Sequence, residues 1–363
     1  MKHVLYGAEI SYFTGKARSY LRWKGIDFEE RPADRAFFKE VCLPRLGRPI
    51  IPVLITPEDE AIQDTTLITD HFEEAVPEPT FTPSKPVQLL VARLLELYAD
   101  DWLLLPAMHY RWNYDADVTM LEFGMNLAPE APLEQQREAG IKAAGPFAGS
   151  LPALGVHEHN QEAIETSFLA LLGELDAHFR QHPFLLGGRP SLADFAFIGP
   201  FYAHLFRDAT SGALMRREAL TVARWVERMM APSGQALGTF LPDDEIAPTL
   251  EPILKRMMRE HMPCLADTQG AMEAWKQGHT GEPPPRAVGM HDFELEGVTA
   301  PRAIRTYGSW LHQRARSVYD AMADDDRARA DALLDRCGGA LFAQTTIDVP
   351  LRLDNCHLQW QES

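Results

Sequence analysis

The order of strands and helices predicted for the N-terminal fifth of this chain constrains its fold more than any other feature. Four short runs have the length and composition of β-strands: 4–8, 26–32, 50–56 and 60–63. Three segments with helical patterns lie between and after them: 14–24, 34–43 and 65–75. The order is therefore β-α-β-α-β-β-α, in which the first two strands pair in parallel through a right-handed crossover and the last two form a hairpin. This order predicts a small α/β domain at residues 1–76.

A change in composition separates this domain from the rest of the chain. Residues 76–86, VPEPTFTPSKP, contain four prolines and are predicted to form a linker. Beyond the linker, several segments favour helices and none reads as a convincing strand: 87–105, 160–181, 191–206 and 216–230. The segment 123–158 is rich in Gly, Pro and Ala and is expected to be partly loop. We therefore predict an all-helical domain at 87–232.

The last part of the chain, residues 240–363, is expected to form a mainly helical extension around the Pro-rich loop GEPPPRAV. Within 301–322, the apolar residues fall on one helical face: Ile304, Tyr307, Leu311, Val318 and Met322. A helix with one apolar face needs a surface to cover that face, so we expect the extension to dock on the helical domain. Its role is left open by the sequence.

Charge and composition exclude several classes of function. The 363 residues carry a formal net charge of −17 without a compensating basic run, which disfavours nucleic acid and anionic membranes as partners. The apolar runs are too short to span a bilayer, and the N-terminus lacks the apolar segment of a secretory signal. The four cysteines lack metal-binding spacing, and the histidines of VHEHN and REHMPC have no second cluster, so we expect no metal. These features predict a cytoplasmic protein with reduced thiols.

Four sequence motifs accompany this order of domains. SYFTGKARSYLRWKGI joins the first two predicted strands, IIPVLI contains Pro52, DTTLITDHF opens a helix, and FLLGGRPSLADFAFIGPFYAHL carries a capping box at Ser191 and Asp194. Together they resemble the glutathione transferase superfamily over residues 1–232, and the chain looks like a bacterial member with a long C-terminal extension. The resemblance implies a thioredoxin-like domain followed by an all-helical domain, glutathione as co-substrate, and a homodimer.

The start of the first helix supplies two candidates for the catalytic hydroxyl, Ser11 and Tyr12. Lowering the pKa of a thiol by two units needs roughly 2.7 kcal/mol of preference for the thiolate. One hydrogen bond to a charged acceptor supplies about 1.5–3 kcal/mol and a helix N-terminus a few tenths more, so one hydroxyl is enough. The resemblance favours Ser11, with Tyr12 as its rival and Thr14 as the N-cap. The alternative is that Ser11 and Thr14 are only turn and cap residues.

A second group of residues is expected to hold the tripeptide. The resemblance implies a cis peptide bond before Pro52 and pairing of the Ile51 backbone with the cysteinyl part of glutathione. At the start of the helix at 65–75, the Asp64 carboxylate suits the γ-glutamyl ammonium. Thr65 and the free N–H groups of the helix start suit its carboxylate, and Gln63 is a weaker candidate beside them. Asp64 as a plain N-cap is the alternative, and the two roles are compatible.

An aromatic segment in the helical domain, YADDWLLLPAMHYRWNYD, is a candidate site for the electrophile. Four of its residues are predicted to line an apolar pocket: Trp102, Met108, His109 and Trp112. The alternative is that this stripe belongs to the core.

Two functions from different classes follow. The first is an enzyme that activates the glutathione thiol for attack on a small, apolar or aromatic electrophile, whose identity the sequence does not give. The second is a non-catalytic binding or protein-interaction module of the same fold. The long extension, Tyr12 where many serine-type members have proline, and Ile50 where a lysine often holds the tripeptide favour this second function.

Overall fold

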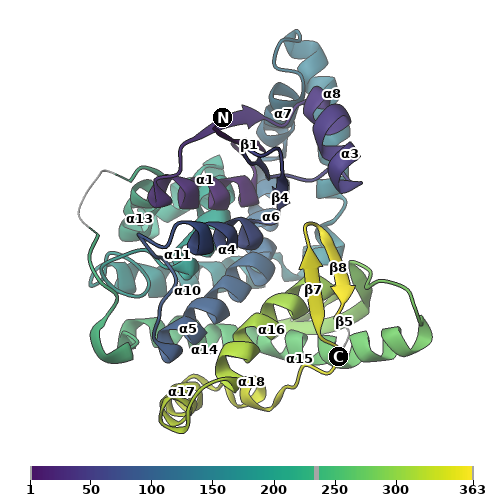
Figure 1. Ribbon diagram of the computed structural model, residues 1–363. Coiled ribbons are helices and arrows are strands. Elements are labelled where there is room, and N and C mark those ends of the chain that lie inside the picture. Colours follow the sequence, from purple (N-terminus) through teal and green to yellow (C-terminus); the bar gives the residue numbers. More distant parts are fainter. Residues whose placement is uncertain (1, 233–236, 362–363) are drawn as a thin grey trace.

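The computed structural model describes residues 2–232 and 237–361, and it has an N-terminal α/β part, a helical part and a C-terminal part (Figure 1). The sheet has the order β2-β1-β3-β4, with β1 parallel to β2 and antiparallel to β3. Its strands are β1 (His3–Gly7), β2 (Phe28–Pro32), β3 (Val53–Ile55) and β4 (Ala61–Gln63). Its helices are α1 (Tyr12–Lys24), α2 (Arg35–Phe37), the π-helical turn η1 (Phe38–Cys42), α3 (Leu43–Leu46) and α4 (Thr65–Ala75). The predicted thioredoxin-like fold is confirmed, although the predicted outer limits at 1 and 363 fall outside the described residues.

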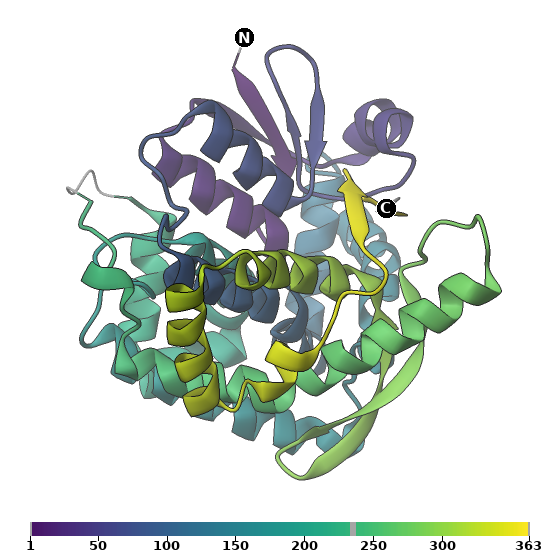
Figure 2. The ribbon, with the colours of Figure 1, turned by 60° about the horizontal axis from the view of Figure 1, so that its bottom comes forward.

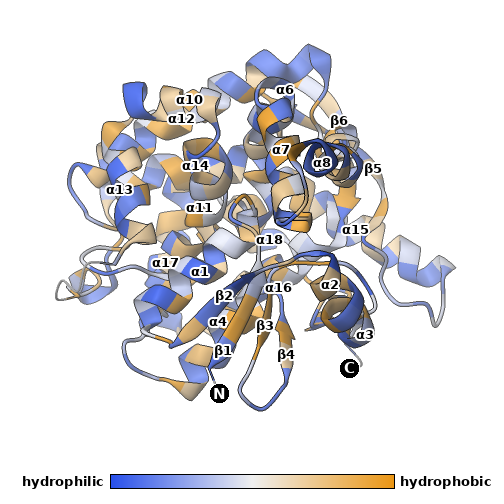
Figure 3. Ribbon diagram, turned by 90° about the horizontal axis from the view of Figure 1, so that it is seen from above, coloured by the Kyte–Doolittle hydropathy of each residue, from blue (hydrophilic) through white to orange (hydrophobic). Residues whose placement is uncertain are grey.

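The two faces of this sheet pack against different helices. Successive side chains of a strand point to opposite faces. Accordingly, Leu5 and Leu54 join the large core that α1 and α4 share with the helical domain, whereas Val53 packs with Phe37 of α2. The strands β1 and β3 are largely apolar and lie between these helices in Figure 3. The large core therefore places the start of α1 and the start of α4 next to the helical domain.

The helical domain follows a linker, as predicted. Its elements are α5 (Pro86–Leu97), the π-helical turn η2 (Tyr98–Trp102), α6 (Leu104–Tyr114), α7 (Ala116–Leu127), α8 (Leu133–Ala148), α9 (Leu151–Leu154), η3 (Glu158–Asn160), α10 (Gln161–Phe179), α11 (Leu192–Pro200), the π-helical turn η4 (Phe201–Phe206), α12 (Ala209–Glu218) and α13 (Leu220–Met230). The capping box is present at the start of α11, where Asp194 Oδ2 accepts from the Ser191 N–H at 2.9 Å. This carboxylate also accepts from Trp225 Nε1 at 3.1 Å, so it ties α11 to α13.

The segment 123–158, expected to be partly loop, is more helical than its composition suggested: most of it lies in α7, α8 and α9, and only 128–132, 149–150 and 155–157 lie outside helices. Glycine inside a helix usually lowers helical stability by about 0.5–1 kcal/mol relative to alanine. Here it permits close packing: a Cβ at Gly124 would lie 1.7 Å from the carbonyl oxygen of Gln136. A Cβ at Gly140 would lie 1.8 Å from the carbonyl oxygen of Met120. The glycines that suggested a loop are therefore the contact between two antiparallel helices.

The C-terminal extension contains two β-hairpins that the sequence analysis missed. Its helices are η5 (Pro242–Asp244), η6 (Pro248–Leu250), α14 (Glu251–Glu260), α15 (Met262–Gly278), α16 (Thr306–Asp320), α17 (Asp324–Cys337) and α18 (Ala340–Gln344). Its strands are β5 (Ala287–Leu295), β6 (Val298–Arg305), β7 (Leu351–Asp354) and β8 (His357–Trp360). The amphipathic helix predicted to start at 301 starts at Thr306, because the preceding residues pair with β5. Helices still make up most of the described part of the extension, and the two hairpins are an addition to what the sequence predicted.

The extension is packed along the helical domain, with α16 beside α5 (Figure 2). The buried carboxylate of Asp101, in η2, receives three cationic or protonatable groups from the extension. His261 Nε2 lies 2.9 Å from it, Arg305 3.0 Å and Arg302 3.5 Å. Gly308 of α16 packs so close that a Cβ there would lie 3.2 Å from the Asp101 side chain. The helical domain and the extension therefore share a buried ionic centre.

Candidate active site

Ser11 is the N-cap of α1. Its backbone is extended, at φ −82° and ψ 126°, and its side-chain oxygen accepts from the Thr14 N–H at 3.2 Å. The expectation that Thr14 would be the cap was wrong. Thr14 is buried and its hydroxyl accepts from the Ala8 N–H at 3.4 Å, in space left by Gly7, where a Cβ would lie 2.3 Å from the Thr14 side chain. As a cap, the half-buried Ser11 hydroxyl uses its oxygen and keeps its hydrogen for donation.

Tyr12 faces a different environment from its neighbour. Its side chain is 4% exposed, and its hydroxyl donates to the Ala99 carbonyl of η2 at 2.5 Å. Its ring fits against Gly199, where a Cβ would lie 2.9 Å from the ring. Burial, aided by Asp100 and Asp101, raises the pKa of Tyr12 well above its usual value. The Tyr12 hydroxyl is therefore bonded to the helical domain, and of the two candidates Ser11 is the one with a hydrogen left to donate.

The segment before β3 has the backbone form that the resemblance implies, since the Ile51–Pro52 peptide bond is cis. Pro52 is buried and Ile51 is half-buried. Within residues 2–232 and 237–361, the Ile51 N–H and C=O form no hydrogen bond with another backbone group. Both groups are therefore available to pair with an extended peptide.

The N-terminus of α4 brings Gln63, Asp64 and Thr65 together. Asp64 is the N-cap, at φ 83°, and its Oδ1 accepts from the Thr66 N–H at 2.8 Å. Burial raises the pKa of Asp64, against the opposing effects of Lys16 and of hydrogen bonds from Tyr307 and Thr66. The Thr65 hydroxyl is buried, as is Gln63 Oε1, and neither has a hydrogen-bond partner among the described residues. The site thus combines a carboxylate, an unpartnered hydroxyl and a helix N-terminus.

Lys16 and Arg18, also on α1, are committed to other charged groups. Lys16 is buried and its ammonium lies 2.5 Å from Asp100 and 3.4 Å from Glu96 of the helical domain. Arg18 forms a bidentate pair with Glu30, at 2.7 and 2.5 Å. Lys16 therefore holds the interface between the two domains.

The four residues predicted to line an electrophile pocket are not brought around one cavity. Trp102 lies under the extension, with the Arg302 guanidinium 4.8 Å from its ring and its Nε1 donating to Glu260 at 3.3 Å. His109 Nε2 lies 2.9 Å from Glu165, whereas Met108 and Trp112 form a separate apolar cluster with Ala144. The stripe is core because the extension covers Trp102 in η2, and the helices after α6 cover Met108 and Trp112.

Two cavities of the helical domain lie beside this stripe. The first, about 10 Å³, is bordered by Trp102 and Pro106 and has room for about one water. The second is an open hollow of about 460 Å³ bordered by Asn113, Val156 and His157. Neither adjoins Ser11 or Asp64.

Two residues that contact Gln63 and Asp64 at the start of α4 (the α4 corner) were not found from the sequence: Tyr307 and Asn355. The Tyr307 hydroxyl donates to Asp64 Oδ2 at 2.8 Å, and Asn355 Oδ1 accepts from the Gln63 N–H at 2.8 Å. Both belong to the extension, more than 240 residues away in sequence. No local motif marks either of them.

The four cysteines are free thiols, and no three His, Cys, Asp or Glu side chains gather as a possible metal site in the described part of the chain. His261 contacts Asp101, and His157 contacts the Pro301 carbonyl at 2.8 Å. No helix in the described ranges is long and apolar enough to cross a membrane.

Comparison with known proteins gives two domain matches. A family model described as glutathione S-transferase, N-terminal domain, matches residues 5–80, and one described as glutathione S-transferase, C-terminal domain, matches 158–228. No curated protein matches the sequence.

Solved structures similar to this chain cover about two thirds of it. The beta-etherase LigF from Sphingobium sp. strain SYK-6 has 17% identity and a TM-score of 0.46, over 64% of this chain and 96% of its own. A glutathione S-transferase from Rhodospirillum rubrum F11 has 17% identity and a TM-score of 0.42, over 68% and 96%. One from Methylobacterium radiotolerans JCM 2831, in complex with glutathione sulfonate, has 21% identity and a TM-score of 0.40, over 66% and 100%.

Proposed function

Because this chain belongs to the glutathione transferase superfamily, we propose that it binds glutathione between Ser11, Ile51 and Asp64 and activates the thiol for attack on a small apolar or aromatic electrophile. The observation that carries the proposal is the buried Thr65 hydroxyl, which has no partner within the described ranges and lies at the start of the 11-residue helix α4. An unpartnered buried polar group costs about 1–3 kcal/mol. A carboxylate bound there would satisfy the hydroxyl and would also accept from free N–H groups of the helix start.

The neighbouring groups suit the other parts of the tripeptide. The Asp64 carboxylate would hold the γ-glutamyl ammonium, and the Ile51 N–H and C=O would pair with the cysteinyl residue. Gln63 Oε1, buried without a partner in the described part of the chain, can accept from a ligand N–H. The tripeptide would then place its sulfur toward the start of α1.

Ser11 is the proposed activating group. Its oxygen already accepts from the Thr14 N–H, which polarises the hydroxyl and fixes its position. The remaining hydrogen can be donated to a thiolate, a charge-assisted bond worth about 1.5–3 kcal/mol, and the N-terminus of α1 adds a few tenths. Capping the helix and stabilising the thiolate are therefore compatible roles for one hydroxyl.

A second candidate function is a module that binds glutathione without turnover. The observation that favours it is that the pocket predicted for the electrophile is filled by core packing around Trp102 and Trp112. A bound thiolate would then have no neighbouring apolar substrate site. The extension would then bind a partner protein and would have no part in catalysis.

Retention on immobilised glutathione, followed by turnover with chlorinated aromatics, epoxides and aryl ethers, tests the two candidates. Turnover that is lost in Ser11→Ala supports the enzyme. Retention without turnover of any of these substrates supports the binding module. Failure of the parent protein to bind glutathione in solution contradicts both.

A further inference from the structure

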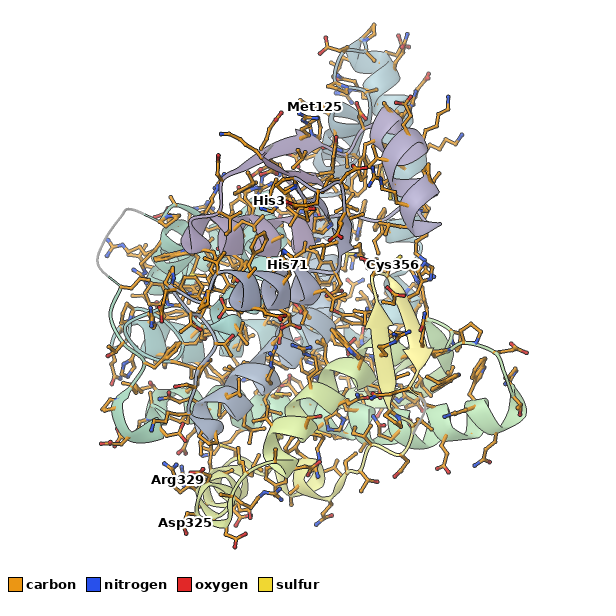
Figure 4. All side chains as sticks on the ribbon, in the orientation of Figure 1. His3, His71, Met125, Asp325, Arg329 and Cys356 are labelled. Carbon is orange, nitrogen blue, oxygen red and sulfur yellow. The ribbon has the colours of Figure 1, made fainter. Side chains whose placement is uncertain are left out.

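The extension reaches the α4 corner at two separate points. Tyr307 is the second residue of α16, and Asn355 lies at the tip of the β7–β8 hairpin. Tyr307 donates to Asp64 Oδ2 and Asn355 accepts from the Gln63 N–H, both at 2.8 Å. Figure 4 labels Cys356, the next residue, at the end of the hairpin that points toward the thioredoxin-like domain. Two elements that are far apart in the extension thus bracket two adjacent residues of the proposed glutathione site.

We propose that the extension completes the glutathione site from within the same chain, with Tyr307 as the positioning residue that holds Asp64 for the γ-glutamyl ammonium. This inference rests on the proposed function. An ionised carboxylate offers about four acceptor positions on its two oxygens. The Thr66 N–H takes one on Oδ1 and the Tyr307 hydroxyl takes one on Oδ2, so each oxygen keeps a position for the ammonium. The two donors fix the rotamer of the carboxylate and favour its ionised form.

The position of Tyr307 is fixed by the residues that flank it. Arg305, two residues before it, lies 3.0 Å from the buried Asp101, and Gly308, directly after it, packs against the same carboxylate. Further along α16, Arg314 pairs with Asp70 of α4 at 2.8 Å. These contacts fix α16 against both domains. They therefore hold the Tyr307 hydroxyl next to Asp64.

A positioning role and an obstructing role for Tyr307 predict opposite effects of removing its hydroxyl. A positioning hydroxyl that is removed leaves Asp64 less well oriented and raises its pKa, so glutathione binds more weakly and is lost at a higher pH on acidification. An obstructing hydroxyl that is removed frees Asp64 Oδ2, so glutathione binds more tightly. In either case, removal of the hydroxyl should leave unchanged the affinity for a ligand that lacks the γ-glutamyl group.

The experiment compares Tyr307→Phe with the matched control Tyr319→Phe by calorimetric titration. Tyr319 lies on the same helix, and its hydroxyl donates to Asp331 at 2.5 Å, away from Asp64. We expect Tyr307→Phe to raise the Kd for glutathione about 3- to 10-fold, in keeping with the loss of one hydrogen bond, and to leave the Kd for cysteinylglycine unchanged. Tyr319→Phe should change neither. Asn355→Gly is the second variant; it removes the Gln63 contact, keeps the φ of 48° accessible, and should weaken glutathione binding in the same direction.

Each outcome bears on a different statement. A parent protein that does not bind glutathione overturns the proposed function and this inference together. A parent that binds, with Tyr307→Phe indistinguishable from Tyr319→Phe, overturns the inference and leaves the function standing. Tighter binding by Tyr307→Phe also overturns it, because the extension would then obstruct the site.

Discussion

The hydroxyl of Tyr12 donates a hydrogen bond to the Ala99 carbonyl, across the interface between the thioredoxin-like and helical domains. Tyr12 follows the cap of α1, and Ala99 lies in the π-helical turn η2. Tyr12, the second candidate for the catalytic hydroxyl, is thus a contact between the two domains. Substitution of Tyr12 should therefore change stability without changing the pKa of the bound thiol, whereas substitution of Ser11 should change that pKa.

Tyr12→Phe should lower the free energy of unfolding by about 0.5–1.5 kcal/mol, the net value of one hydrogen bond, and leave the pKa of the bound thiol unchanged. Urea denaturation measures the first quantity, and the ultraviolet thiolate band of the glutathione complex followed against pH measures the second. A shift of the thiolate titration in this variant would make tyrosine the activating group.

Ser11→Ala and Ser11→Asp should separate the two roles proposed for Ser11. Both remove the donor. Ser11→Ala should raise the pKa of the bound thiol by about one to two units, or roughly 1.4–2.7 kcal/mol, and Ser11→Asp should raise it by at least as much, because its carboxylate also repels the thiolate. Alanine also removes the cap, at a cost of about 1 kcal/mol of stability, whereas aspartate is itself a good N-cap. If Ser11→Asp keeps the parent's thiolate titration, the hydroxyl is only a cap.

Thr65→Ala should weaken glutathione binding by about 1–3 kcal/mol without lowering the stability of the unliganded protein, because the hydroxyl lacks a partner among the described residues. Thr69 of the same helix is the matched control, since its hydroxyl donates to the Thr65 carbonyl at 2.9 Å. Titration calorimetry and urea denaturation on both variants check this. Unchanged affinity in Thr65→Ala would reduce Thr65 to a helix-start residue.

Acid should weaken the extension through His312. Burial, aided by Arg316, lowers the pKa of His312 to about 3, below the value near 6.5 of an unfolded chain. A base with a depressed folded-state pKa contributes stability above the unfolded pKa and loses it as the pH falls toward the folded pKa. The advantage of the parent over His312→Gln in unfolding free energy should therefore shrink by about 2–3 kcal/mol between pH 7 and pH 4. A constant difference in urea denaturation over this range would contradict the prediction.

The homodimer expected from the family remains a prediction. Light scattering at micromolar concentration should give about twice the chain mass of 40.8 kDa. A mass of one chain would contradict the prediction.

Much of the fold was predictable because its signals are local. The strands β1 and β3 run largely apolar over a few residues, and the capping box at Ser191 is a pattern within four positions. The hairpin β5–β6 was missed because its strands carry His291, Asp292 and Pro301, which are depleted in strands or atypical of them, and their pairing depends on a turn with positive φ at Glu296 and Gly297.

The candidate site was only partly predictable. Asp64 and Thr65 share one helix start, so a short motif places them together. The contacts from Tyr307 and Asn355 arise from packing of elements hundreds of residues away, and nothing in their immediate sequence encodes it. Trp102 is a similar case. Its aromatic segment is compatible with a pocket or with the core, and only the packing of the extension over it decides between them.

The ionic centre around Asp101 has a consequence for the engineering of this protein. His261, Arg302 and Arg305 all come from the extension and share this one carboxylate. Replacing Asp101 with an apolar residue of similar size would leave these groups buried without a counter-charge, a loss of about 3–5 kcal/mol for a broken pair of this kind. The aspartate therefore has to be kept, or changed together with its partners, in any variant that retains the extension.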